Sequence, residues 1–166
     1  GGKHMTAHAR SPVHGTTSGE AYWGPGDRYV FHVTGAESGD SMFAFDCLVG
    51  PGGGPPPHRH LAEDELFFLY EGSIEFNAAE RTHVVSAGEA IFVPRGTTHS
   101  YRNVGEGNAL MYTIYTPAGM EGWFREVFER VRPGEFDMAP PPADEAMIAR
   151  MLDAGPRYNV EWVAEV

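Results

Sequence analysis

Between residues 28 and 116, short runs of β-branched and aromatic residues alternate with turns that contain glycine, asparagine, aspartate or proline. Val, Ile, Phe and Tyr favour extended strands, and the turn residues interrupt them every few positions. Runs of this length and spacing are typical of a β-sandwich or barrel and not of a parallel α/β sheet. The expected strands are 28–34, 41–49, 65–70, 73–77, 82–85, 90–93, 99–103 and 110–116.

The period of the apolar residues changes after Pro117. From there they recur at helical spacing, which predicts a helix over 120–131. A second short helix is expected over 143–153, and a last strand over 157–163.

These patterns divide the chain into three parts. Residues 1–24 are expected to be an expression-tag remnant followed by a loose N-terminal arm. Residues 25–117 are expected to form a β-barrel. Residues 118–166 are expected to supply the C-terminal helices and strand, packed on that barrel.

The charge balance argues against two classes of partner. Asp and Glu number 23 against 12 Lys and Arg, which gives a formal net charge of −11. Nucleic acid and anionic membranes both attract a basic face, so we expect neither as a partner. No apolar stretch reaches the length of a membrane span and no signal-peptide pattern opens the chain, so the expected location is the cytoplasm. Cys47 is the single cysteine, and no internal disulfide can form.

Two segments carry polar residues at regular intervals. The first contains Gly52, His58, His60, Glu65 and Gly72, and the second contains Gly88, Pro94, Gly96, His99 and Asn103. Residues i and i+2 of a strand face the same side, so His58 and His60 present two imidazoles together. Glu65 follows a short turn, and His99 comes from a distant strand that closure of the barrel must bring in. Three imidazole nitrogens and one carboxylate oxygen suit Fe, Ni, Mn, Co, Cu or Zn without selecting among them.

At these positions the chain resembles the cupin superfamily, whose paired motifs it matches over residues 52–103. The resemblance implies an all-β fold, the cupin double-stranded β-helix or jelly-roll barrel, followed here by two short C-terminal α-helices. It also implies that His58, His60, Glu65 and His99 bind one divalent metal ion per chain. Two alternatives stay open. The histidines could only form hydrogen bonds in a metal-free cupin, or a shift of one residue could make Asp64 the ligand.

Strand parity predicts which side chains face the interior beside the ligands. Tyr101 has the parity of His99, and Phe67 has the parity of Glu65. The tentative substrate pocket consists of Phe45, Phe67, Tyr101, Met111 and Tyr115. Core packing explains each of these residues equally well, because the interior of a small barrel is both core and pocket.

The C-terminal third, from Thr116 onward, is more loosely similar to the tail of bacterial cupins grouped with quercetin 2,3-dioxygenases. This resemblance implies a metal-dependent dioxygenase that acts with O₂ on an aromatic or enolic small molecule, with Glu65 as a ligand or as the catalytic base. The alternatives are a non-redox lyase, decarboxylase or isomerase, and a small-molecule-binding protein without turnover. We also expect a homodimer. The two helices either cap the cavity or only complete the outside of the sheet.

Overall fold

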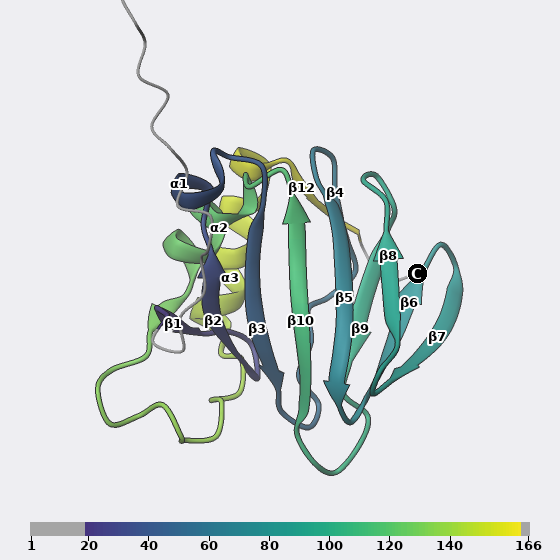
Figure 1. Ribbon diagram of the computed structural model, residues 1–166, viewed down its shortest axis with the longest axis vertical. Coiled ribbons are helices and arrows are strands. Elements are labelled where there is room, and N and C mark those ends of the chain that lie inside the picture. Colours follow the sequence, from purple (N-terminus) through teal and green to yellow (C-terminus); the bar gives the residue numbers. More distant parts are fainter. Residues whose placement is uncertain (1–18, 164–166) are drawn as a thin grey trace, which may run out of the picture.

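Two antiparallel β-sheets make up most of the computed structural model, which describes residues 19–163 (Figure 1). The seven-stranded sheet has the order β11-β1-β2-β3-β10-β5-β8. Its strands are β1 (Ala21–Trp23), β2 (Asp27–Val33), β3 (Phe43–Val49), β5 (Asp64–Glu71), β8 (Ala90–Val93), β10 (Ala109–Thr116) and β11 (Glu129–Arg130). The five-stranded sheet has the order β12-β4-β9-β6-β7. Its strands are β4 (His58–His60), β6 (Ser73–Ala78), β7 (Arg81–Ser86), β9 (His99–Arg102) and β12 (Val160–Trp162).

The expected all-β fold is confirmed as two antiparallel sheets, which is consistent with the expected jelly roll, although the described strands do not join into one closed barrel. All eight expected strands are present, with ends that shift by one or two residues. The strand expected from residue 41 starts at Phe43 because a short helix, α1 (Gly35–Ser38), precedes it. The Ser38 hydroxyl donates to the Met42 carbonyl and accepts from the Met42 amide, which keeps these residues in a turn.

The core lies between the sheets and follows the alternation of each strand. In β10 every second side chain is buried, and the residues between them are half-buried. Its buried residues Met111, Thr113 and Tyr115 pair with β3 on one side and β5 on the other. Large aromatic side chains fill the interior, and Phe43, Phe67 and Phe76 are almost completely buried. Burial of one such side chain contributes about 1.5–3 kcal/mol.

Two helices lie at one side of the sheets, next to β1 and β2 (Figure 1). They are α2 (Met120–Val127) and α3 (Glu145–Ala154), and a 3₁₀ turn, η1 (Gly155–Tyr158), follows α3 directly. The α2 residues Met120, Trp123, Phe124 and Val127 are buried at i, i+3, i+4 and i+7, which gives the helix one apolar face.

The expectation that this helix reaches residue 131 was wrong. It ends at Val127, and Phe128 adopts an extended conformation with φ −100° and ψ 151°. Glu129 and Arg130 then form β11, which pairs with Trp23 and Tyr22 of β1. The backbone groups on this edge of β1 would otherwise lack hydrogen-bond partners, so pairing with them stabilises an extended chain at residues 129 and 130. The helical spacing of the apolar residues contains no information about that partner strand.

Residues 21–23 differ from the loose arm expected up to residue 24, because they form β1 and are buried. Residues 1–18 lie outside the described residues, so the tag remnant and most of the arm are not described. The last strand expected over 157–163 is β12, which pairs with β4. Both sheets therefore draw strands from either side of the boundary expected at residue 117. Among residues 19–163, no helix has the length and apolar character needed to cross a membrane.

Candidate metal centre

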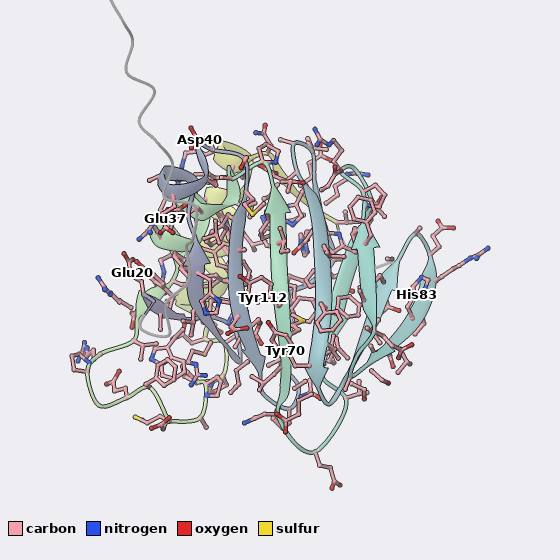
Figure 2. The ribbon with its side chains drawn as sticks, in the orientation of Figure 1. Glu20, Glu37, Asp40, Tyr70, His83 and Tyr112 are labelled. Carbon is pink, nitrogen blue, oxygen red and sulfur yellow. The ribbon has the colours of Figure 1, made fainter. Side chains whose placement is uncertain are left out.

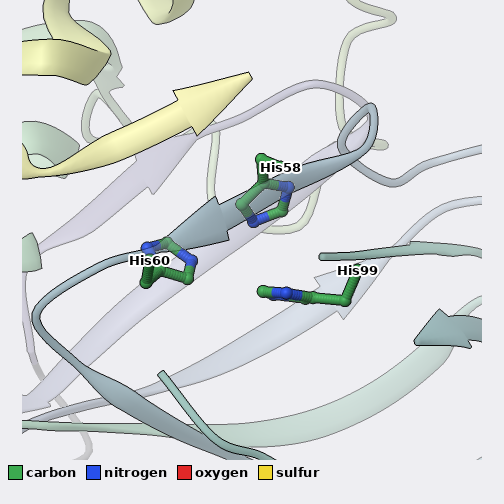
Figure 3. Close-up of side chains that lie close together, drawn as sticks. All are labelled: His58, His60 and His99. Atoms are coloured by element: carbon green, nitrogen blue, oxygen red, sulfur yellow. The ribbon is translucent and has the colours of Figure 1, made fainter. Parts of the chain in front are cut away.

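Three histidines from two neighbouring strands meet inside the protein (Figure 3). His58 and His60 project from the same face of β4, and His99 of β9 is the register partner of His58. One ring nitrogen of each histidine lies within 4.8 Å of the corresponding nitrogens of the other two. All three side chains are buried. The sequence spacing therefore gathers the three imidazoles that it led us to expect.

Backbone carbonyls orient two of these rings. His58 Nδ1 lies 2.8 Å from the Pro56 carbonyl oxygen, and His99 Nδ1 lies 2.9 Å from the Thr97 carbonyl oxygen. A carbonyl can only accept, so Nδ1 carries the proton in both rings. The lone pair of each neutral ring is then on Nε2, and a backbone partner of this kind is the usual support of a metal-ligating histidine.

Glu65, at the start of β5, closes the group from the other sheet. Its Oε2 lies 3.0 Å from His99 Nε2 and 3.4 Å from His60 Nε2. Burial alone would raise the pKa of the Glu65 carboxyl, but the hydrogen bond with His99 and the close approach of His60 outweigh it and lower this pKa. Burial and the two neighbouring imidazoles hold the pKa of His58 well below its usual range. The centre thus combines an ionised carboxylate with at least one neutral imidazole.

Two neighbouring acidic residues, Asp64 and Glu63, are also candidates for the carboxylate ligand, but their carboxylates lie elsewhere. Asp64 points outward and accepts from Arg95, with 2.9 Å to the backbone nitrogen and 3.2 Å to Nε. Glu63 is buried, and its Oε1 lies close to Gly119 at the start of α2. Burial raises the pKa of the Glu63 carboxyl. Of the three acidic residues, Glu65 is the one within 3.5 Å of the histidine nitrogens.

The centre fits a divalent transition-metal ion. Neither ring nitrogen of His60 has a hydrogen-bond partner among the described residues, although both are buried. Buried polar atoms normally have a partner, so unpaired nitrogens in a cluster of imidazoles indicate a ligand site. Among the described residues, His58, His60 and His99 form the group of His, Cys, Asp or Glu side chains whose ligand atoms lie close enough together to hold a metal ion. Its donors do not distinguish one transition metal from another.

The candidate metal centre opens into a cavity of about 40 Å³. That volume holds a few waters at most. Of the pocket residues expected from the sequence, Phe45, Phe67, Tyr101 and Tyr115 line the cavity. Met111 does not line it and is buried within the core.

A second polar group lies behind the cavity wall. Tyr29 and Tyr101 line the cavity, and both hydroxyls hydrogen-bond to Oδ2 of Asp27, at 3.1 and 2.9 Å. Asp27 is completely buried, and its Oδ1 has no hydrogen-bond partner among the described residues. Burial raises the pKa of Asp27 to about 7, even though the two tyrosine hydrogen bonds oppose the shift.

Comparison with known protein families identifies the family to which this fold and centre belong. Residues 45–115, which include all four expected ligands, match the family model described as a cupin domain. The chain belongs to the cupin superfamily.

Known proteins are similar to this cupin over part of their length. Germin-like protein 1-1 of rice (Oryza sativa subsp. japonica) is 37% identical over 82 residues, which are 46% of this chain and 37% of the rice protein. Quercetin 2,3-dioxygenase of Aspergillus japonicus is 32% identical over 107 residues, which are 58% of this chain and 29% of the enzyme. This cupin thus spans less than two thirds of the length of either curated relative.

A solved structure supports the fold. The predicted oxalate decarboxylase from Thermotoga maritima superposes with a TM-score of 0.57 at 16% identity and covers 63% of this chain and 98% of its own. At that identity the likeness concerns the fold alone.

Several residues that line the cavity of the cupin were not among the five expected pocket residues, although those of α2 belong to a helix that was expected either to cap the cavity or to pack outside the sheet. They are Tyr29, Thr113, Met120, Trp123, Phe124 and Trp162, among others. The alternation of the first expected strand could have identified Tyr29. Trp162 gave no local signal, because it reaches the cavity through the pairing of β12 with β4. Met120, Trp123 and Phe124 line the cavity from α2, so this helix contacts the site as well as the core.

The other strand histidines lie away from the centre. His83 is exposed on the outlying β6–β7 hairpin (Figure 2). His32 lies 3.3 Å from Asp46.

Proposed function

We propose that this cupin is a metal-dependent dioxygenase that acts with O₂ on a small molecule bearing an enolic or aromatic hydroxyl. The observation that carries the proposal is the meeting of three imidazoles and one carboxylate at an enclosed cavity with aromatic walls. The similarity to a quercetin 2,3-dioxygenase, 32% identical over 107 residues, supports the reaction class.

We assign His58, His60, Glu65 and His99 as the ligands of one divalent ion. When bound, such an ion supplies Lewis acidity and, if it is redox-active, electron transfer with O₂. The carbonyls of Pro56 and Thr97 hold two of the rings through Nδ1, so that Nε2 is the nitrogen that each ring can offer to an ion; in this structure Nε2 of His99 lies 3.0 Å from Glu65 Oε2.

Glu65 is a ligand in this proposal, since its lowered pKa favours the anionic form. It can accept the proton of a substrate hydroxyl only when the interactions with His60 and His99 that lower this pKa are released. The aromatic walls formed by residues such as Phe67 and Tyr115 exclude water from the reacting molecule.

The small cavity restricts how a substrate enters. A space of about 40 Å³ is below the size of ordinary ligand pockets, which begin near about 300 Å³. A ring-sized substrate must therefore displace side chains of the wall. Trp123 and Phe124 lie on α2, which is not paired with the strands of the centre, whereas Trp162 belongs to β12, which pairs with β4. We propose that α2 acts as the movable part of the wall.

Oxygen uptake tests the proposal. The protein is loaded with Fe, Mn, Ni, Co, Cu or Zn, metal is measured by elemental analysis, and O₂ consumption is followed with catechols, enediols and flavonols. We expect stoichiometric metal and uptake of O₂ with at least one of these compounds. His58→Ala should abolish both, and His83→Ala, which removes an exposed strand histidine, should change neither.

Other outcomes would select the alternatives. Conversion of a substrate without O₂ consumption would indicate a lyase, decarboxylase or isomerase. Tight binding without turnover would indicate a binding protein.

The homodimer is also part of this proposal, but pairing of β1 with a strand of the partner cannot form its interface. β1 is paired on both sides, by β2 and β11, so this strand has no free edge for a partner. Light scattering that gives the 18.2 kDa of one chain at micromolar concentration would reject the dimer.

A further inference from the structure

We infer that Tyr29 and Tyr101 form a second binding subsite in the cavity, one that accepts a hydrogen bond from a hydroxyl group of the substrate. Asp27 positions the two phenols and does not itself line the cavity. The inference rests on the proposed function in one respect, because it takes this cavity to be the substrate site.

The polarity of the subsite follows from its hydrogen bonds. Both phenol oxygens lie within 3.1 Å of the same Asp27 oxygen, Oδ2. Two hydroxyls that share one acceptor atom must each point their hydrogen at it. What each phenol offers to the cavity is therefore a lone pair. A ligand group beside them is stabilised if it donates a hydrogen bond, and a group that can only accept finds no donor.

Asp27 holds this arrangement as a carboxylate, which can only accept. In the neutral acid a proton on Oδ2 would donate to one phenol and free that phenol's hydrogen, since Oδ1 has no hydrogen-bond partner among residues 19–163. The inference therefore concerns the ionised form, and the affinities of the two probes are compared at pH 8 or above. Gly53 lies directly against Oδ1, and a Cβ at this position would approach that oxygen to 2.7 Å. The carboxyl group is therefore fixed from both sides.

The subsite and the candidate metal centre are two poles of one cavity. Tyr101 and His99 are residues i+2 and i of β9 and face the same side, so their Cα atoms are about 7 Å apart. The Phe67 ring lies between the poles, with its centroid 6.5 Å from the His99 ring and 5.8 Å from the Tyr101 ring. The molecule that fits is small, has an apolar or ring-shaped middle and carries an oxygen at each end, of which the end at Tyr101 is a free hydroxyl.

Two probes of nearly equal shape test the polarity. Phenol can donate a hydrogen bond, and anisole, its methyl ether, can only accept one. Their affinities for the full-length protein are measured by calorimetry and by the fluorescence of the tryptophans, as purified and again after chelation of metal. The chelated sample removes any contribution from coordination of the phenol oxygen.

We expect phenol to bind about fivefold to tenfold more tightly than anisole in both samples, since one hydrogen bond is at stake. Tyr101→Phe should reduce the ratio to about twofold or less. Tyr112→Phe is the matched control, because this tyrosine lies on the outer face of the seven-stranded sheet (Figure 2) and does not line the cavity. It should keep the wild-type ratio.

Asp27→Asn separates positioning from simple packing. The amide keeps the volume of the carboxyl but can donate through Nδ2, which frees one phenol hydrogen to point into the cavity. Anisole should then gain affinity relative to phenol, with the melting temperature recorded to confirm folding. A loss of packing alone would weaken both probes equally.

Equal affinities of the two probes in the wild type would overturn the inference, as would a wild-type ratio in Tyr101→Phe or a failure of both probes to bind. These results are distinguishable from failure of the dioxygenase proposal. A protein that prefers phenol but consumes no O₂ keeps the subsite and loses the reaction. A protein that consumes O₂ without the preference keeps the reaction and loses the subsite.

Discussion

Asp64 and Glu65 are neighbours in β5, and their carboxylates lie on opposite faces of the sheet. Asp64 accepts from Arg95 at the surface, while Glu65 is 3% exposed and lies 3.0 Å from His99 Nε2. The alternation of a strand thus separates two chemically similar residues into a surface ion pair and a candidate ligand.

This relationship provides a matched pair of variants. Glu65→Gln should weaken metal binding at least tenfold, because it replaces an anionic donor by a neutral amide. Asp64→Asn removes the same charge one residue away and should leave metal affinity within about twofold of wild type. Competition with a chromophoric chelator measures both. Equal losses in the two variants would mean that the net charge near the site, and not coordination by Glu65, determines affinity.

Metal removal should lower thermal stability. A ligand that binds only the folded state stabilises it by about 4 kcal/mol at a thousandfold excess over Kd. For a chain of this size that corresponds to a shift in melting temperature of about 10 °C. Scanning calorimetry before chelation, after chelation and after reloading measures the shift. His99→Ala should show no difference between the three samples, and a full shift in that variant would place the ion elsewhere.

The buried carboxyl of Asp27 should make the stability of the protein depend on pH, and a variant at this one residue can test that dependence. Its pKa is raised by burial from 3.8 to about 7, so the folded state holds a proton that the unfolded state releases. The contribution of this group to the free energy of unfolding is therefore fully present at low pH and declines as pH rises from about 4 to about 7. Above pH 7 it no longer changes, and the whole decline amounts to ~4 kcal/mol. Tyr29, Tyr101 and Cys47 face Asp27 and stay neutral in this range, because their pKa values are raised well above the usual ones by burial.

Urea unfolding of wild type and Asp27→Asn at pH 4.5, 6 and 8, both free of metal, tests this. The variant cannot ionise, so its stability relative to wild type should increase with pH. A difference that is constant across the three pH values would refute the assignment.

Substitution of Phe124 tests how much of the free energy of unfolding depends on the packing of α2. Its ring packs 4.9 Å from the rings of both Tyr29 and Phe45, and it is 4% exposed. Phe124→Ala should cost about 3–5 kcal/mol of unfolding free energy. Phe92→Ala, at a side chain that is 58% exposed, should cost less than about 0.5 kcal/mol. Similar losses in both variants would show that α2 does not anchor the aromatic core.

The sequence was informative where spacing alone determines position. Alternation placed His58 beside His60, and turn residues marked the eight expected strands between residues 28 and 116, although β1, β4 and β11 were not among the expected strands. It was less informative where a position depends on a partner remote in sequence. Phe128 keeps the helical spacing of Trp123 and Phe124, yet the free edge of β1 draws the next residues into a strand.

Asp27 illustrates the second limit. An aspartate at the start of a strand ordinarily faces water. The carboxyl of Asp27 has Tyr29 of the same strand as one buried partner, and the approach of Tyr101 from another sheet provides the second. No local pattern encodes that approach. Trp162 is similar, because its place in the cavity wall follows from the pairing of β12 with β4.

That pairing also sets an order of events during synthesis. β4 carries two of the three clustered histidines and lies between β9 and β12. Val160 pairs with His60, although the ribosome adds it 100 residues later. Until then the nascent chain has made every expected ligand but leaves one side of β4 uncovered. If the proposed ion binds, its final enclosure is therefore a late step of maturation, and a cell that delivers metal early would deliver it to an open site from which it can still exchange.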